Sequence, residues 1–130
     1  MRFFYPFLTA TLLPVLAAQA QAPTLATRLP AANAVAAPRN TEVALSFSEA
    51  MSAQTAAADA VRVVSQWRGL LPGTYSGGGT STIRFAPASA LLPGELVRVG
   101  VTTAATSLAG GTAAVPTQYQ FTAQAPGGSG

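Results

Sequence analysis

The sequence of 130 residues contains no cysteine, no histidine and no lysine. Without cysteine, the chain can form no disulfide, offers no thiol nucleophile and cannot hold a cysteine-ligated zinc or iron–sulfur centre. Without histidine, it lacks the commonest metal ligand and the usual general base at neutral pH. No histidine, lysine or cysteine is available to activate a serine or threonine hydroxyl for nucleophilic catalysis. We therefore expect no metal site, no cofactor and no enzymatic activity.

Charged residues of either sign are scarce. Seven arginines and four acids give a net charge of +3, but the arginines occur singly along the chain. Binding to nucleic acid needs clustered cations that displace phosphate counterions, so we expect no nucleic-acid partner.

The sequence also lacks motifs for calcium, phosphate or catalysis. A single Asp is too few for a calcium loop, and Gly77–Gly79 lacks the lysine and helix of a phosphate-binding loop. The alternation of the neighbouring residues places Glu42 on the solvent side, and Glu95 falls in a turn. We therefore expect solvated carboxylates rather than a catalytic pair.

The first twenty residues differ in composition from the rest of the chain. A positively charged start, Met1-Arg2, precedes an uncharged and mostly apolar stretch over residues 3–18, and small residues follow. This order is typical of a secretory signal peptide. The apolar stretch is short and is interrupted by two prolines, which does not suit a membrane-spanning helix. We expect an exported protein, without a membrane span after cleavage, that is secreted or held at the cell surface, with the periplasm also open.

Two A-x-A frames could direct cleavage, one ending at Ala20 and the other at Ala22. A cut after Ala22 would leave Pro23 directly beyond the scissile bond, where its fixed φ fits an extended substrate poorly. We therefore expect cleavage after Ala20 and a signal peptide over residues 1–20.

Short runs of alternating apolar and polar residues occupy most of the remaining chain. Such period-2 alternation of β-branched and aromatic residues with polar ones is typical of half-buried strands. The predicted strands cover residues 24–29, 43–47, 61–63, 82–85, 97–102 and 118–122, with a further one within 69–75. Glycine- and proline-containing turns separate them, including Pro93-Gly94. About seven short strands over roughly 100 residues predict an all-β, antiparallel sandwich.

Two segments do not follow the strand pattern. The alanines within residues 49–60 favour one or two helical turns, which Ser52 could cap. At the other end, residues 124–130 have the composition of a flexible Gly/Ser-rich tail or linker. The predicted organisation is thus a signal peptide at 1–20, a sandwich domain at 24–123 and a tail at 124–130, with further domains of a larger surface protein left open.

The predicted core consists of the large apolar residues of the strands and of the loops between them. The set is Leu25, Leu29, Val35, Val43, Leu45, Phe47, Val61, Val63, Ile83, Phe85, Leu92, Val97, Val99, Val101, Tyr119 and Phe121. At about 1.5–3 kcal/mol for each buried large side chain, this set suffices for one modest domain.

Several motifs in the chain resemble bacterial Ig-like domains of the SbsA type. Residues 40–51, NTEVALSFSEAM, resemble the family pattern N-T-x-I-x-L-x-F-S-E-P-M, and residues 30–35 resemble the P-x-x-x-x-V that precedes it. Further along, residues 82–87 resemble T-L-x-F-x-P and residues 92–94 resemble the L-x-P-G turn. Leu108 to Gly111 matches the D-x-x-G-N region loosely, so the resemblance covers about residues 24–123. It implies an Ig-like sandwich that serves as a spacer or interaction module of exported proteins and has no catalytic role.

Two departures from the family pattern concern local features rather than the fold. Val97 stands where the family usually has a tyrosine, so we do not expect the tyrosine-corner hydrogen bond. Ser107 and Gly111 replace the acid and asparagine of the late loop, which weakens any case for a metal there. Glu49, inside the main motif, is expected to fix the loop by accepting backbone N–H bonds or by meeting an arginine.

Trp67 is the most informative single side chain. In antibody-like domains a tryptophan packs in the core, and we expect the same here. The alternative is an exposed aromatic platform, with Tyr75 nearby across a hairpin, that stacks on a sugar or on another protein. Arg68 and Arg98 could add hydrogen bonds to such a ligand. The candidate ligand-binding residues are therefore Trp67, Tyr75 and Arg68.

Two functions follow as hypotheses. The first is a non-catalytic exported module that acts as a structural spacer or as a protein-interaction or adhesion domain at the bacterial cell surface. The second is a carbohydrate-binding module that uses exposed aromatic side chains. The expected partner is accordingly a protein or a cell-surface polysaccharide.

Overall fold

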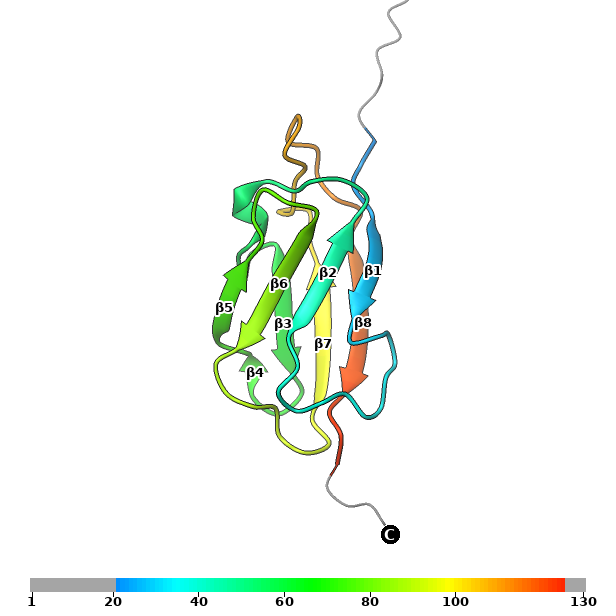
Figure 1. Ribbon diagram of the computed structural model, residues 1–130, viewed down its shortest axis with the longest axis vertical. Coiled ribbons are helices and arrows are strands. Elements are labelled where there is room, and N and C mark those ends of the chain that lie inside the picture. The colour runs from blue at the N-terminus through cyan, green and yellow to red at the C-terminus, as the bar shows by residue number, and fades with distance from the viewer. Residues whose placement is uncertain (1–20, 126–130) are drawn as a thin grey trace, which may run out of the picture.

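Two antiparallel sheets of four strands each pack face to face in the computed structural model, which describes residues 21–125 (Figure 1). The predicted signal peptide at residues 1–20, and residues 126–130 of the predicted tail, lie outside the described residues. The first sheet has the order β1 (Leu25–Leu29), β2 (Val43–Phe47), β6 (Thr82–Pro87), β5 (Gly73–Ser76). The second has the order β4 (Gly69–Leu70), β3 (Val61–Ser65), β7 (Leu96–Val101), β8 (Thr117–Thr122).

The strand order is that of an immunoglobulin sandwich. The first sheet corresponds to the strands A-B-E-D, and the second to C-F-G with one added edge strand beside C. The expected Ig-like all-β fold is confirmed, with eight strands in place of about seven. Among residues 21–125, no helix is long and apolar enough to cross a membrane.

The extra strand arises because the chain changes sheets within residues 69–75. β4 pairs with β3 in the second sheet, whereas β5 pairs with β6 in the first. At the crossing, Gly73 lies so close to its neighbours that a Cβ atom there would be 2.3 Å from the Ala86 carbonyl oxygen and 2.6 Å from the Phe85 ring. Glycine is therefore required at this position by the close approach of two strands.

A second crossing covers the edge of β8. After β1, residues 33–37 run beside β8: the Asn33 N–H donates to the Gln120 carbonyl, and the Thr122 N–H donates to the Ala34 carbonyl. Ala37 then forms a parallel bridge with Ala123. These bonds occupy outer backbone groups of β8 at Gln120 and Thr122, so this part of the edge is not open to another strand.

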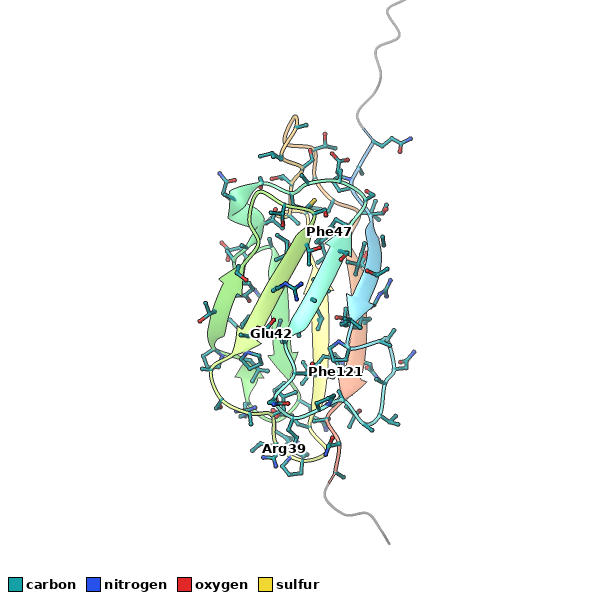
Figure 2. All side chains as sticks on the ribbon, in the orientation of Figure 1. Arg39, Glu42, Phe47 and Phe121 are labelled. Carbon is teal, nitrogen blue, oxygen red and sulfur yellow. The ribbon has the colours of Figure 1, made fainter. Side chains whose placement is uncertain are left out.

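The core lies between the sheets and follows the predicted alternation. Phe47 on β2 and Phe121 on β8 lie toward opposite ends of it (Figure 2). Of the large residues expected in the core, twelve are buried: Val43, Leu45, Phe47, Val61, Val63, Ile83, Phe85, Val97, Val99, Val101, Tyr119 and Phe121. Leu25 is partly buried against them.

Three residues expected in the core are exposed instead. Leu29 is 63% exposed because it ends an edge strand. Val35 is 77% exposed because its neighbours Ala34 and Ala37, and not Val35, take the positions that pack against the core. Leu92 is 38% exposed, and its neighbour Leu91 takes the buried position. Met51 is also buried, although it was not among the expected core residues.

The predicted helical turns in residues 49–60 reduce to one 3₁₀ turn at Ala53–Thr55. Ser52 occupies the N-cap position, but its hydroxyl contacts the hydroxyls of Thr55 and Thr106 and caps no backbone N–H. Buried Thr55 donates to the Thr106 carbonyl and accepts from the Thr106 N–H. These bonds hold the segment against the loop after β7, and this packing outweighs the helix propensity of alanine.

Candidate functional site

Trp67 lies in the turn between β3 and β4, and its side chain is 54% exposed. The expectation that it packs in the core is wrong. The alternation of β3 places Ser65 inward, and the chain leaves the strand before Trp67. The Ser65 hydroxyl then accepts the N–H groups of Trp67 (3.0 Å) and Arg68 (3.1 Å), which fixes the turn and holds Trp67 outside the core.

Beneath this turn, the carboxylate of Glu95 is completely buried. Arg68 donates to both of its oxygens, from Nη2 to Oε1 at 2.8 Å and from Nε to Oε2 at 2.9 Å. The Leu92 N–H also donates to Oε1 at 2.6 Å, and the Ser65 hydroxyl donates to Oε2. The expectation of a solvated Glu95 is therefore wrong, because the turn before β7 folds the side chain inward beneath Arg68.

The ionised form of Glu95 is favoured despite its burial. Burial by itself raises the pKa of this carboxyl, but the hydrogen bonds from Arg68, Ser65 and Leu92 together outweigh it, so the pKa lies below its ordinary value. The carboxylate in turn raises the pKa of Arg68 through the same hydrogen bond. A bidentate pair of this kind is geometrically specific, and it ties the β3–β4 turn to the start of β7.

Arg68 is consequently a poor candidate for ligand binding. Its guanidinium is turned toward Glu95, with a further 3.4 Å contact from Nη1 to the Ser89 hydroxyl. Only 30% of its side chain is exposed. The structure therefore assigns Arg68 a role in holding the turn that presents Trp67.

Tyr75 lies on β5, in the other sheet, and faces inward. Its ring packs against Phe85 with centroids 4.7 Å apart, and its hydroxyl donates to the Val61 carbonyl at 2.8 Å. Burial raises the pKa of Tyr75, and the nearby charge of Arg62 lowers it by a smaller amount. The Tyr75 hydroxyl thus lies at the start of β3, whereas Trp67 lies in the turn beyond its other end, and the two ends of this five-residue strand are about 13 Å apart. The structure thus does not bring Trp67 and Tyr75 onto one platform.

The other candidate residues take separate positions. Arg98 lies on the outer face of β7 and lines a hollow of about 340 Å³ with Gln66, the residue before Trp67. Within residues 21–125, Glu49 forms neither of the expected anchoring contacts, because no backbone N–H donates to it and no arginine pairs with it. Glu42 is exposed, as expected, and lies 3.8 Å from Arg84.

The described part of the chain also lacks a cluster of acids that could hold a metal ion. Sequence reasoning missed the Glu95–Arg68–Ser65 network because Glu95 lies 27 residues from Arg68 and 30 from Ser65 along the chain, and no local pattern joins it to them. One signal was present: Ser65 falls at an inward position of an alternating strand, where a buried hydroxyl needs a partner.

Fold and site together define an Ig-like β-sandwich module whose main polar network holds a turn in place. Residues 19–123 match the family described as bacterial Ig-like domain, and the chain belongs to this family. No relative was found among curated protein sequences.

Solved structures support the same fold at low sequence identity. The LD transpeptidase LdtMt1 in complex with imipenem is 18% identical with a TM-score of 0.58, and the match covers 80% of this chain and 41% of that one. The N-terminal part of the bacterial S-layer protein SbsC is 15% identical with a TM-score of 0.58, over 80% of this chain and 24% of that one. CopC from Methylosinus trichosporium OB3b is 14% identical with a TM-score of 0.57, over 83% of this chain and 99% of that one. The chain thus spans less than half of the transpeptidase and of SbsC.

Proposed function

We propose that this chain is a non-catalytic, exported Ig-like module that acts as a structural spacer or interaction domain at the bacterial cell surface. The observation that carries the proposal is the position of the domain's two ends. The described chain begins at one end of the long axis and finishes at the other (Figure 1). A domain with this arrangement can be joined in line with others without folding the chain back on itself.

Backbone contacts hold each end of the domain in place. Near the start, the Val115 N–H donates to the Pro23 carbonyl at 3.0 Å, beside the loop that leads into β8. Near the finish, the Gly94 N–H donates to the Ala123 carbonyl at 3.2 Å, beside the turn before β7. These two contacts are separated by the length of β7, and six extended residues span about 20 Å.

Two further observations support the proposal. The fold resembles domains of an S-layer protein that contains several of them, in a structure described as surface layer protein SbsC, domains 1–6. The polar network around the buried carboxylate of Glu95 holds a turn and does not face a cleft. By the resemblance, neighbouring domains of a larger surface protein are the expected partners.

The shape of a tandem protein tests the spacer function. Residues 21–125 contain both sheets and their common core, so we would join two copies of residues 21–130 through the chain's own tail and measure their dimensions by small-angle X-ray scattering. An in-line module should give a maximum dimension close to twice that of one copy. A control with a long Gly/Ser linker should give a broader distribution that includes shorter distances. A compact tandem, with its copies packed side by side, would contradict the proposal.

Carbohydrate binding is the second candidate, and the exposure of Trp67 favours it. Retention on insoluble polysaccharides and on peptidoglycan tests it, with Trp67→Ala beside Leu108→Ala. Leu108 is a matched control because it is an apolar side chain that is 57% exposed in the loop after β7. Retention that is lost only with Trp67→Ala supports sugar binding. Retention that is absent, or that is equal for the native protein, Trp67→Ala and Leu108→Ala, rules out a sugar-binding site at Trp67.

A further inference from the structure

The outer face of the second sheet gathers positive charge. Arg62 on β3 and Arg98 on β7 both point outward at exposed positions, and the strands β3, β4, β7 and β8 contain no acidic residue. Arg28, on the adjoining edge strand β1, lies over the ring of Tyr119 with 5.2 Å from Cζ to the ring centroid. We call Arg28, Arg62 and Arg98, with Val64 and Gln118 between them, the arginine face.

Two shallow hollows join these arginines into one surface. The first, of about 530 Å³, is lined by Arg62, Val64, Arg98 and Gln118. The second, of about 490 Å³, is lined by Arg28 and again by Arg98 and Gln118. Because Arg98 and Gln118 line both hollows, the two hollows adjoin, and together they extend from Arg62 on β3 across β7 and β8 to Arg28 on β1.

The charges on the arginine face are not neutralised within the domain. The two ion pairs found in residues 21–125 use Arg68 and Arg84, on other parts of the molecule. Arg28, Arg62 and Arg98 therefore keep guanidinium donors in a geometry suited to carboxylates.

We propose that the arginine face binds an extended acidic peptide segment of a partner protein. Arg62 on β3 lies opposite Gly100 on β7, and Gly100 is two residues from Arg98. The two arginines are therefore diagonal neighbours, about 7–8 Å apart. In an extended peptide, residues i and i+2 point the same way and lie about 6.6–6.8 Å apart. Glu or Asp at alternate positions would thus meet successive arginines.

Two alternative occupants fit the face less well. The outward positions of β3, β7 and β8 carry no aromatic ring, so a sugar would find no stacking platform there. A second copy bound through the same face would oppose arginine to arginine, which is unfavourable. The proposal rests on the interaction role proposed above, and it adds the chemical class of the partner.

A synthetic peptide of alternating Glu and Thr tests the inference, with a Gln/Thr peptide as the uncharged control. Binding of the labelled peptide to a protein of residues 21–130 would be followed by fluorescence anisotropy at two salt concentrations. We expect the Glu peptide to bind more tightly than the Gln peptide, and its affinity to fall with salt. Arg62→Gln and Arg98→Gln should each weaken binding about threefold to fivefold.

Arg84→Gln is the matched control, since it removes one exposed arginine from the outer face of the other sheet. It should leave the affinity unchanged. Equal weakening by Arg84→Gln, or equal affinity for the Glu and Gln peptides, would overturn the proposal. Tighter binding of an oligouronate or of anionic lipid vesicles than of the peptide would also overturn it, by assigning the face to another ligand. None of these outcomes affects the spacer function, which the tandem protein tests separately.

Discussion

Replacing Glu95 with glutamine should destabilise the domain far more than a surface charge change does. Glutamine has nearly the same shape, but it offers one acceptor oxygen and one donor NH₂ group in place of two acceptor oxygens. The native carboxylate accepts from Arg68 twice, from Ser65 and from the Leu92 N–H. In Glu95→Gln, two of these donors would face another donor inside the protein.

The expected size follows from the contacts that are lost. A hydrogen bond to a charged group contributes about 1.5–3 kcal/mol, so the loss of two would cost about 3–6 kcal/mol. Arg68 keeps 30% of its side chain exposed, and partial hydration of its guanidinium reduces that cost to about 2–4 kcal/mol. For a domain of this size, such a loss lowers the Tm by about 10–25 °C.

Thermal and urea unfolding followed by circular dichroism would measure this difference. The control is Glu42→Gln, which removes a carboxylate that is 53% exposed and 3.8 Å from Arg84. It should cost less than about 1 kcal/mol. If both variants lower the Tm by the same amount, the carboxylate of Glu95 does not stabilise the fold through its buried hydrogen bonds.

The effect of Glu95→Gln should also depend on pH. The pKa of Glu95 is lowered in the folded protein from its ordinary value of 4.5, so its ionisation stabilises the fold. This contribution is complete above pH 4.5 and is lost as the pH falls through the folded pKa. The stability difference between the native protein and Glu95→Gln should therefore be constant near neutral pH and shrink in acid. A difference that stays constant down to pH 2 would contradict the assignment.

Three further predictions concern single side chains. Tyr75→Phe should lower the free energy of unfolding by about 0.5–1.5 kcal/mol because it removes a hydrogen bond to β3. Tyr119→Phe should be near neutral because that buried hydroxyl has no partner among residues 21–125. Chemical denaturation of the two variants measures the difference. In the same assay, Gly73→Ala should destabilise the domain by about 1–3 kcal/mol through steric overlap. Gly100→Ala should be neutral or stabilise it by up to about 1 kcal/mol, because a Cβ atom there would have its nearest neighbour 4.0 Å away. The fluorescence of Trp67, the single tryptophan, should be quenched readily by iodide, and a protected emission would contradict its exposed position.

The order of the strands along the chain could be predicted well from the sequence. The alternation of Val43, Leu45 and Phe47 with polar neighbours determines one buried face, and a shift by one residue would expose all three. Similar patterns predicted β3, β6, β7 and β8 within a few residues. The family motif over residues 40–51 then indicated how such strands are assembled, and the family match over residues 19–123 confirmed it.

The predictions that failed concern residues whose environment is set by distant parts of the chain. Leu91 and Leu92 are adjacent and chemically alike, and only the path of the turn decides which of them is buried. Trp67 was expected in the core because other Ig-like domains place a tryptophan there. In this chain, Ser65 takes the last inward position of β3, and its hydroxyl holds the turn outside the sheet.

The sequence by itself therefore determined the class of fold, the buried faces of most strands and the absence of cysteine and histidine chemistry, because these depend on local periodicity and on composition. Only the tertiary structure decided that Glu95 is a buried, ionised anchor, that Trp67 and Tyr75 lie far apart, and that Arg62 and Arg98 share one face. The physical reason is that hydrogen bonding, burial and charge neutralisation act between groups that meet only when the two sheets fold.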